Sequence, residues 1–146
     1  MVSPEAGATP TRQAVILGAA DGLTLVVGLL LGMRHHSGAV FAAALSAGLA
    51  ELVGMSAALW LSNTRNVKNF VVAMSCGVMT ALACVIPALP YLFWGGTVAL
   101  SAALALLAAL GAFICWMRPE KGTRAALETY GLLLAAGALC FAATLL

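Results

Sequence analysis

The sequence predicts an all-α, polytopic membrane protein with five transmembrane helices, its N-terminus in the cytoplasm and its C-terminus outside. Of its 146 residues, 63% are hydrophobic and only 8% are charged, and the mean hydropathy is +1.06. Soluble domains carry about 25% charged residues, which cover their water-exposed surface. Because backbone polar groups in hydrocarbon need internal partners, the expected spanning elements are helices.

Five apolar segments are each long enough to cross a bilayer as a helix, which takes about 20 residues. Together they occupy nearly the whole chain, so we expect one transmembrane domain over residues 1–146 and no separate soluble domain. Pro87 and Pro90 are expected to end the third helix, with a tight turn before Trp94. The predicted spans cover residues 13–32, 39–62, 67–89, 91–117 and 125–146.

The distribution of positive charge predicts the orientation. Arg34 lies in the connection between the first and second spans, whereas every other Lys and Arg lies on the side of the N-terminus. Cytoplasmic loops carry the excess of Lys and Arg, so this side is expected to be cytoplasmic. We expect the plasma membrane of a bacterium, or the vacuolar membrane if the source is eukaryotic. The N-terminal-side cations are Arg12, Arg65, Lys68, Arg118, Lys121 and Arg124.

Two acids lie deep inside apolar segments. At 1.5 Å per residue, Asp21 of the first span is roughly 13 Å from the cytoplasmic face and Glu51 of the second is roughly 16 Å from it. A charged group near the bilayer centre costs at least about 2.5 kcal/mol, so it needs a partner, water or an ion. The matched depth predicts that the two carboxyls hold a cation or protons together. The alternative is a pair of protonated acids that form hydrogen bonds between helices.

Met55 follows Glu51 by one helical turn, so its thioether is expected close to the carboxylate. Oxygen and thioether sulfur suit a borderline or soft divalent metal better than Ca²⁺ or Mg²⁺. The predicted metal ligands are therefore Asp21, Glu51 and Met55. A second interpretation of Met55, as a packing residue, remains open.

Glycines on the first span form a stripe that includes Asp21. Gly18/Gly22 and Gly28/Gly32 are two GxxxG pairs, a spacing that allows close approach of helices. We expect this face to meet a second copy of the chain, giving a homodimer through the first helix.

Other polar groups have two interpretations each. His35 and His36 either form a polar turn or bind a departing metal, and Glu128 either pairs with Arg124 at the start of its helix or recruits cations. The four cysteines are expected to be small core residues. No hydrolase, P-loop or HExxH motif is present, and the net charge of +2 is too small to indicate nucleic-acid binding. We therefore predict neither an enzyme nor a bound cofactor.

Three short motifs in order resemble the vacuolar iron transporter family: Asp21-Gly22-Leu23-Thr24, Gly48-Leu49-Ala50-Glu51-Leu52 and Ile86-Pro87-Ala88-Leu89-Pro90-Tyr91. The resemblance implies a homodimer that exports ferrous iron and related divalent metals from the cytosol in exchange for protons. It matches Asp21 and Glu51 to the family's pathway acids. The chain differs at Leu59, where the family has a methionine, and at residues 63–66, where the family has a long acidic metal-binding segment.

The expected function is proton-coupled export of a divalent transition metal, Fe²⁺ and/or Mn²⁺, from the cytosol. One alternative is proton-coupled export of organic cations, which would need a roomy, aromatic-lined pocket that these small-residue faces do not suggest. A second alternative is a non-transporting membrane assembly subunit that uses the two acids as hydrogen-bonding groups between helices.

Overall fold

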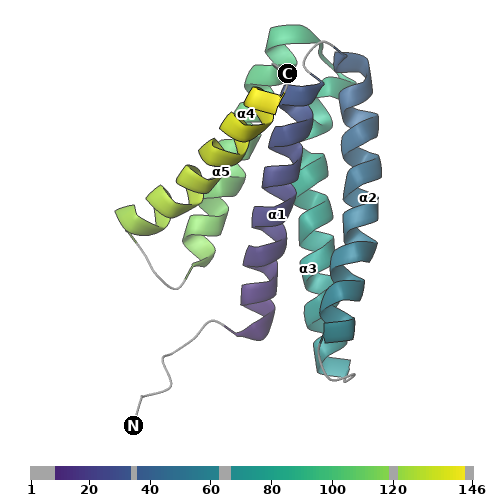
Figure 1. The fold of residues 1–146 in the computed structure, drawn as a ribbon, viewed down its shortest axis with the longest axis vertical. Coiled ribbons are helices and arrows are strands. Elements are labelled where there is room, and N and C mark those ends of the chain that lie inside the picture. Colours follow the sequence, from purple (N-terminus) through teal and green to yellow (C-terminus); the bar gives the residue numbers. More distant parts are fainter. Residues whose placement is uncertain (1–8, 34–35, 63–66, 119–121, 144–146) are drawn as a thin grey trace.

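The protein is a bundle of five α-helices with one 3-10 helix (Figure 1), as seen in a computed structural model. The structure describes residues 9–33, 36–62, 67–118 and 122–143, and these ranges contain no strand. The predicted all-α class is confirmed. The elements are α1 (Pro10–Gly32), α2 (Ser37–Ser62), α3 (Val67–Val85), η1 (Ile86–Leu92), α4 (Gly96–Met117) and α5 (Thr123–Ala143).

The boundary between the third and fourth helices differs from the prediction. Pro87 and Pro90 lack the amide hydrogen that an α-helix needs, and the chain continues past Val85 as the 3-10 helix η1. Tyr91, predicted to begin the fourth span, therefore belongs to η1. The turn then passes Gly95, and α4 begins at Gly96, whose φ of 62° favours glycine.

Among the described residues, four helical segments are long and apolar enough to cross a membrane: Pro10–Gly32, Gly38–Ser62, Lys68–Leu92 and Gly96–Met117. Large apolar side chains point away from the bundle, including Val53 and Leu61 on α2 and Phe70 on α3. Such an apolar exterior belongs in lipid, so the chain is a membrane protein. Helix α5 carries Arg124 and Glu128 in its first two turns, and its crossing of the membrane remains a prediction.

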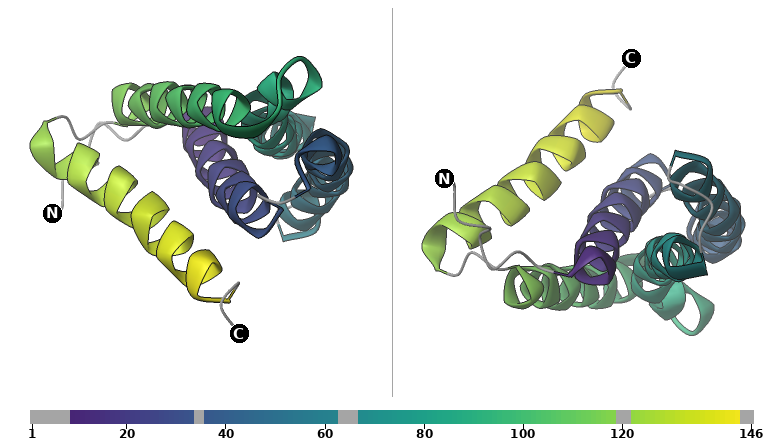
Figure 2. Two further views of the ribbon diagram at one scale, coloured as in Figure 1. Left: turned by 90° about the horizontal axis from the view of Figure 1, so that it is seen from above. Right: turned by 90° about the horizontal axis from the view of Figure 1, so that it is seen from below.

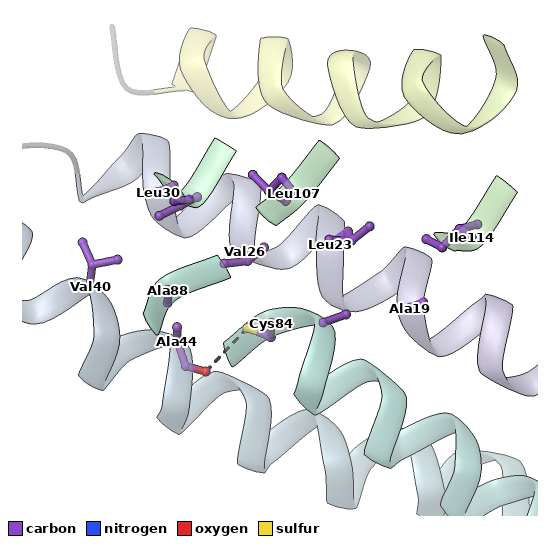
Figure 3. Packing of buried hydrophobic residues seen from close by; sticks show 12 residues of the cluster. Ala19, Leu23, Val26, Leu30, Val40, Ala44, Cys84, Ala88, Leu107 and Ile114 are labelled. Atoms are coloured by element: carbon purple, nitrogen blue, oxygen red, sulfur yellow. Dashed lines mark hydrogen bonds between the residues drawn. The ribbon is translucent and has the colours of Figure 1, made fainter. Parts of the chain in front are cut away.

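Helix α3 packs extensively against both α1 and α2, while α1 and α2 touch each other much less. Helix α4 lies beside α1 and η1, and α5 crosses α1 at an angle (Figures 1 and 2). Small residues let these helices approach closely, and the core combines them with a few larger side chains (Figure 3). The core cluster consists of Ala19, Leu23, Val26, Leu30, Val40, Ala44, Ala83, Cys84, Ala88, Ala103, Leu107 and Ile114.

One end of the bundle carries the described cations. Helices α1, α3 and α5 begin there and α2 and α4 end there (Figure 1). Nearby, Trp60 of α2 packs edge-on against Phe70 of α3, with 5.3 Å between ring centroids. We call this the cation-rich end; its placement in the cytoplasm remains a prediction. Arg34, Arg65 and Lys121 lie outside the described residues, and the cations at this end are Arg12, Lys68, Arg118 and Arg124.

Candidate functional site

Two glycines of α1 are in tight contact with α3. A Cβ added at Gly18 would collide with the carbonyl oxygen of Cys76, and one added at Gly22 would collide with that of Thr80. The first half of the glycine stripe, which we expected at a homodimer interface, is therefore occupied within the chain. A Cβ at Gly28 would lie 3.2 Å from the Cys140 sulfur of α5.

Gly32, the last glycine of the stripe, faces open space. Nothing in the described part of the chain lies within 4 Å of a Cβ built there. The predicted contact with a second copy can therefore use only this end of the stripe. The homodimer itself remains a prediction.

Asp21 lies beside the α3 contact and lines a cavity of about 1030 Å³ between α1 and α5. Helix α1 contributes one side of this cavity, the long lateral face of α5 the other, and the last turn of α4 closes part of it. We call it the α1–α5 cavity. Its lining residues are Ile16, Leu17, Ala20, Asp21, Thr24, Ile114, Arg118, Leu127, Glu128, Thr129, Gly131, Leu132, Leu133, Ala135, Ala136 and Leu139.

The other polar side chains of the α1–α5 cavity already have partners. Thr24 donates its hydroxyl to the backbone carbonyl of Asp21 at 2.8 Å, and Thr129 donates to that of Ala125 at 2.9 Å. Arg118 and Glu128 form an ion pair at 2.5 Å. The Asp21 carboxylate, by contrast, receives no hydrogen bond and no ion pair from the described residues. Within the described lining, it is the polar side chain left to bind something else.

Glu51 and Met55 lie on α2 between two close contacts with α3, and both are partly buried. On one side, a Cβ at Gly48 would lie 3.0 Å from Val85 of α3. On the other side, Gly77 of α3 packs closely against Ser56. The buried Ser56 hydroxyl has no hydrogen-bond partner in the described part of the chain. Glu51 and Met55, which are predicted to lie close together, are thus on the side of α2 that faces α3.

Cys84 of α3 lies near both acids. Its thiol lies within electrostatic range of the Glu51 and Asp21 carboxylates. It also donates to the carbonyl oxygen of Ala44 at 3.5 Å (Figure 3). The sequence placed the acids at matched depth on two consecutive helices, and in the structure α1 and α2 meet mainly through α3. Cys84 was expected only as core filler; it is buried, but it also lies within range of both acids.

A complete metal site is not present in the described residues of one chain. No group of three or more His, Cys, Asp and Glu side chains there is arranged to hold a metal ion. The predicted set offers a carboxylate from α1, a carboxylate from α2 and the thioether of Met55. Any metal held by these groups would need further ligands from water or from a second copy.

A network of arginines ties three helices together at the cation-rich end. Arg12 of α1 donates to the carbonyls of Met117 and Arg118, which end α4. Arg118 in turn contacts Glu128 of α5, and Arg124 pairs with the same carboxylate at 3.1 Å. The Arg124–Glu128 pair is confirmed as predicted. The contact from Arg118 was missed because it bridges the connection between α4 and α5.

The histidine cluster predicted at the opposite end is described only in part. His36 is exposed, and its backbone amide donates to the carbonyl of Met33 at 2.8 Å. Arg34 and His35 lie outside the described residues. The two interpretations of this segment therefore both stay open.

Comparison of the chain with protein-family models, with curated proteins and with solved structures finds no match. The likeness to vacuolar iron transporters accordingly remains a resemblance of three short motifs. The function of the chain is therefore inferred from its two intramembrane acids and their surroundings.

Proposed function

We propose that the protein exports a divalent transition metal, Fe²⁺ and/or Mn²⁺, from the cytosol in exchange for protons. The observation that supports this most is the pair of carboxylates within apolar helices. Asp21 and Glu51 both lie near Cys84 of α3, and neither receives a hydrogen bond or ion pair from the described residues. Keeping such acids in a membrane is costly, which favours a functional role over a structural one.

The charges suit this exchange. Two carboxylates supply two negative charges, which balance one divalent cation or two protons. An arriving metal displaces protons from the acids, and protons entering from the outer side displace the metal in turn. Net export requires the cation-rich end to face the cytosol, as the distribution of Lys and Arg predicts.

The ligands available in one chain favour a homodimeric transporter. With two carboxylates and one thioether, a single chain falls short of the ligand number of most transition-metal sites. A second copy of the chain would supply a second set of these ligand groups. The glycine face at Gly18 and Gly22 is covered by α3, so the proposed contact between copies does not use these two glycines.

The proposal is tested with Asp21→Asn and Glu51→Gln in proteoliposomes. Both changes keep side-chain volume and hydrogen-bonding ability but remove the charge. Flux of Fe²⁺, Mn²⁺, Co²⁺ and Zn²⁺ under a pH gradient should fall to near background in either variant. Glu120→Gln, an amide change outside the apolar segments, is the matched control and should leave flux unchanged.

Other outcomes would favour the alternatives. If both amide variants retain full metal-driven proton movement, the proposed mechanism is wrong. If the wild type moves none of the four metals while both variants fold and insert normally, the protein is better described as an assembly subunit.

A further inference from the structure

We propose that the α1–α5 cavity binds a lipophilic organic monocation, with the Asp21 carboxylate as its counter-charge. This ligand class goes beyond the proposed metal export. The metal proposal uses Asp21 together with Glu51 and Met55, whereas this one uses Asp21 as part of the cavity lining. Three features of the cavity support it: its size, the chemistry of its walls and the state of its polar groups.

The cavity is far larger than a metal ion needs. At about 1030 Å³ it lies at the upper end of the range for small-molecule sites, roughly 300–1,000 Å³. A metal ion requires several ligand atoms within bonding distance. Among the described lining residues, only one carboxylate is without a partner, because Glu128 is paired with Arg118 and Arg124. The cavity therefore suits a bulky ligand that carries a single charge.

The walls favour a hydrocarbon body. Aliphatic side chains of α1 and α5, such as Leu17, Leu132 and Leu139, face the cavity, and no aromatic residue is among its described lining. Binding would thus depend on buried apolar area and on one charge pair, without the aromatic cage that small quaternary ammonium ligands use. The roomy pocket required for an organic cation is present, although the aromatic lining that we expected for it is not found in the described residues.

The unpartnered carboxylate selects the sign of the charge. A neutral acyl chain would fill the same space but leave Asp21 uncompensated in an apolar surrounding. An anionic amphiphile would be repelled by it. A cation whose charged centre reaches Asp21 satisfies both the walls and the carboxylate. Helix α5 crosses α1 at an angle (Figure 2), and the cavity that would hold this ligand lies between these two helices.

The experiment compares two ions of similar size and opposite charge. Tetraphenylphosphonium and tetraphenylborate are titrated against the full-length protein in zwitterionic nanodiscs, with empty nanodiscs as background. The wild type should bind the phosphonium above the empty-nanodisc background. Its binding of the borate should not exceed that background. Asp21→Asn should weaken phosphonium binding at least about tenfold, which corresponds to ~1.4 kcal/mol, and Asp21→Glu should restore much of it.

Matched variants separate this site from the metal pathway. Glu51 does not line the cavity, so Glu51→Gln should bind the phosphonium like wild type while losing metal flux. Ala135→Trp should place an indole ring among the lining residues of the cavity and weaken binding. Ala142→Trp, an equal increase in size on an exposed part of α5 that lines no described cavity, should have no effect.

The inference is overturned if wild type and Asp21→Asn bind the phosphonium equally, if the borate binds as well as the phosphonium, or if Ala135→Trp leaves binding intact. If the wild type transports none of the metals but binds the phosphonium, the metal proposal is wrong and this one stands. Asp21-dependent metal flux without phosphonium binding would do the reverse.

Discussion

Replacing Gly22 with alanine should destabilise the protein, because the new methyl group has nowhere to go. Its nearest neighbours are the backbone carbonyl of Thr80 and the Ala83 methyl group, the latter at 2.9 Å. A backbone carbonyl within a helix cannot rotate away as a flexible side chain can. The helices must therefore separate locally, and overpacking of this kind costs about 1–3 kcal/mol.

The comparison variant is Gly54→Ala in α2. No described atom lies within 4 Å of a Cβ at Gly54, so the change should only improve helix propensity, by about 0.5–1 kcal/mol. Gly22→Ala gains the same propensity term, which reduces its net loss to at most about 2.5 kcal/mol. Because the propensity term is common to both, the two alanine variants should differ by the overpacking cost alone, about 1–3 kcal/mol, with Gly54→Ala the more stable.

Unfolding of the detergent-solubilised protein by sodium dodecyl sulfate, followed by circular dichroism, measures this difference. Adding Ala83→Gly to Gly22→Ala should rescue little, since the collision with the Thr80 carbonyl remains. Equal stability of the Gly22→Ala and Gly54→Ala variants would refute the close packing of α1 on α3. Full rescue by Ala83→Gly would instead show that the side-chain contact dominates.

Three further predictions concern other parts of the chain. Met55→Leu should weaken transport of Co²⁺ and Zn²⁺ more than that of Mn²⁺, which depends less on sulfur; equal loss for all metals would indicate packing. Arg118→Gln should lower the unfolding midpoint more than Arg124→Gln, since Arg118 is more buried and bonds to α5 at several points. Gly32→Leu should abolish crosslinks between copies of α1, and crosslinks that persist would place the dimer interface elsewhere.

Much of the fold could be predicted because long apolar runs leave a membrane chain few options. The five helices follow from the segment lengths, and the Arg124–Glu128 pair follows from a spacing of four residues on one helix. Local periodicity was sufficient for both. The 3-10 helix through Tyr91 was missed because the prolines mark where the α-helix must stop but not what the chain forms next.

The arrangement of the site was harder to predict, since it depends on which helix faces which. A GxxxG pair indicates that something approaches closely but does not identify the neighbour, and at Gly18 and Gly22 the neighbour is α3 and not a second copy. Gly77 gave no comparable pattern, although it seats directly against α2. The proximity of Cys84 to both acids likewise depends on α3 lying between α1 and α2, which no local pattern reveals.

The contact between α1 and α3 also limits how the protein can move. Gly18 and Gly22 fit against carbonyls that are one turn apart on α3, so sliding either helix along the other would drive backbone into backbone. Helices α1 and α3 therefore form a rigid pair, and Asp21 belongs to it. Helix α5 faces this pair across the α1–α5 cavity, and near its start it is bonded to Arg118 through Glu128. Any rocking motion that alternately exposes Asp21 to the two sides of a membrane would therefore come from movement of α5 and the other helices relative to α1 and α3.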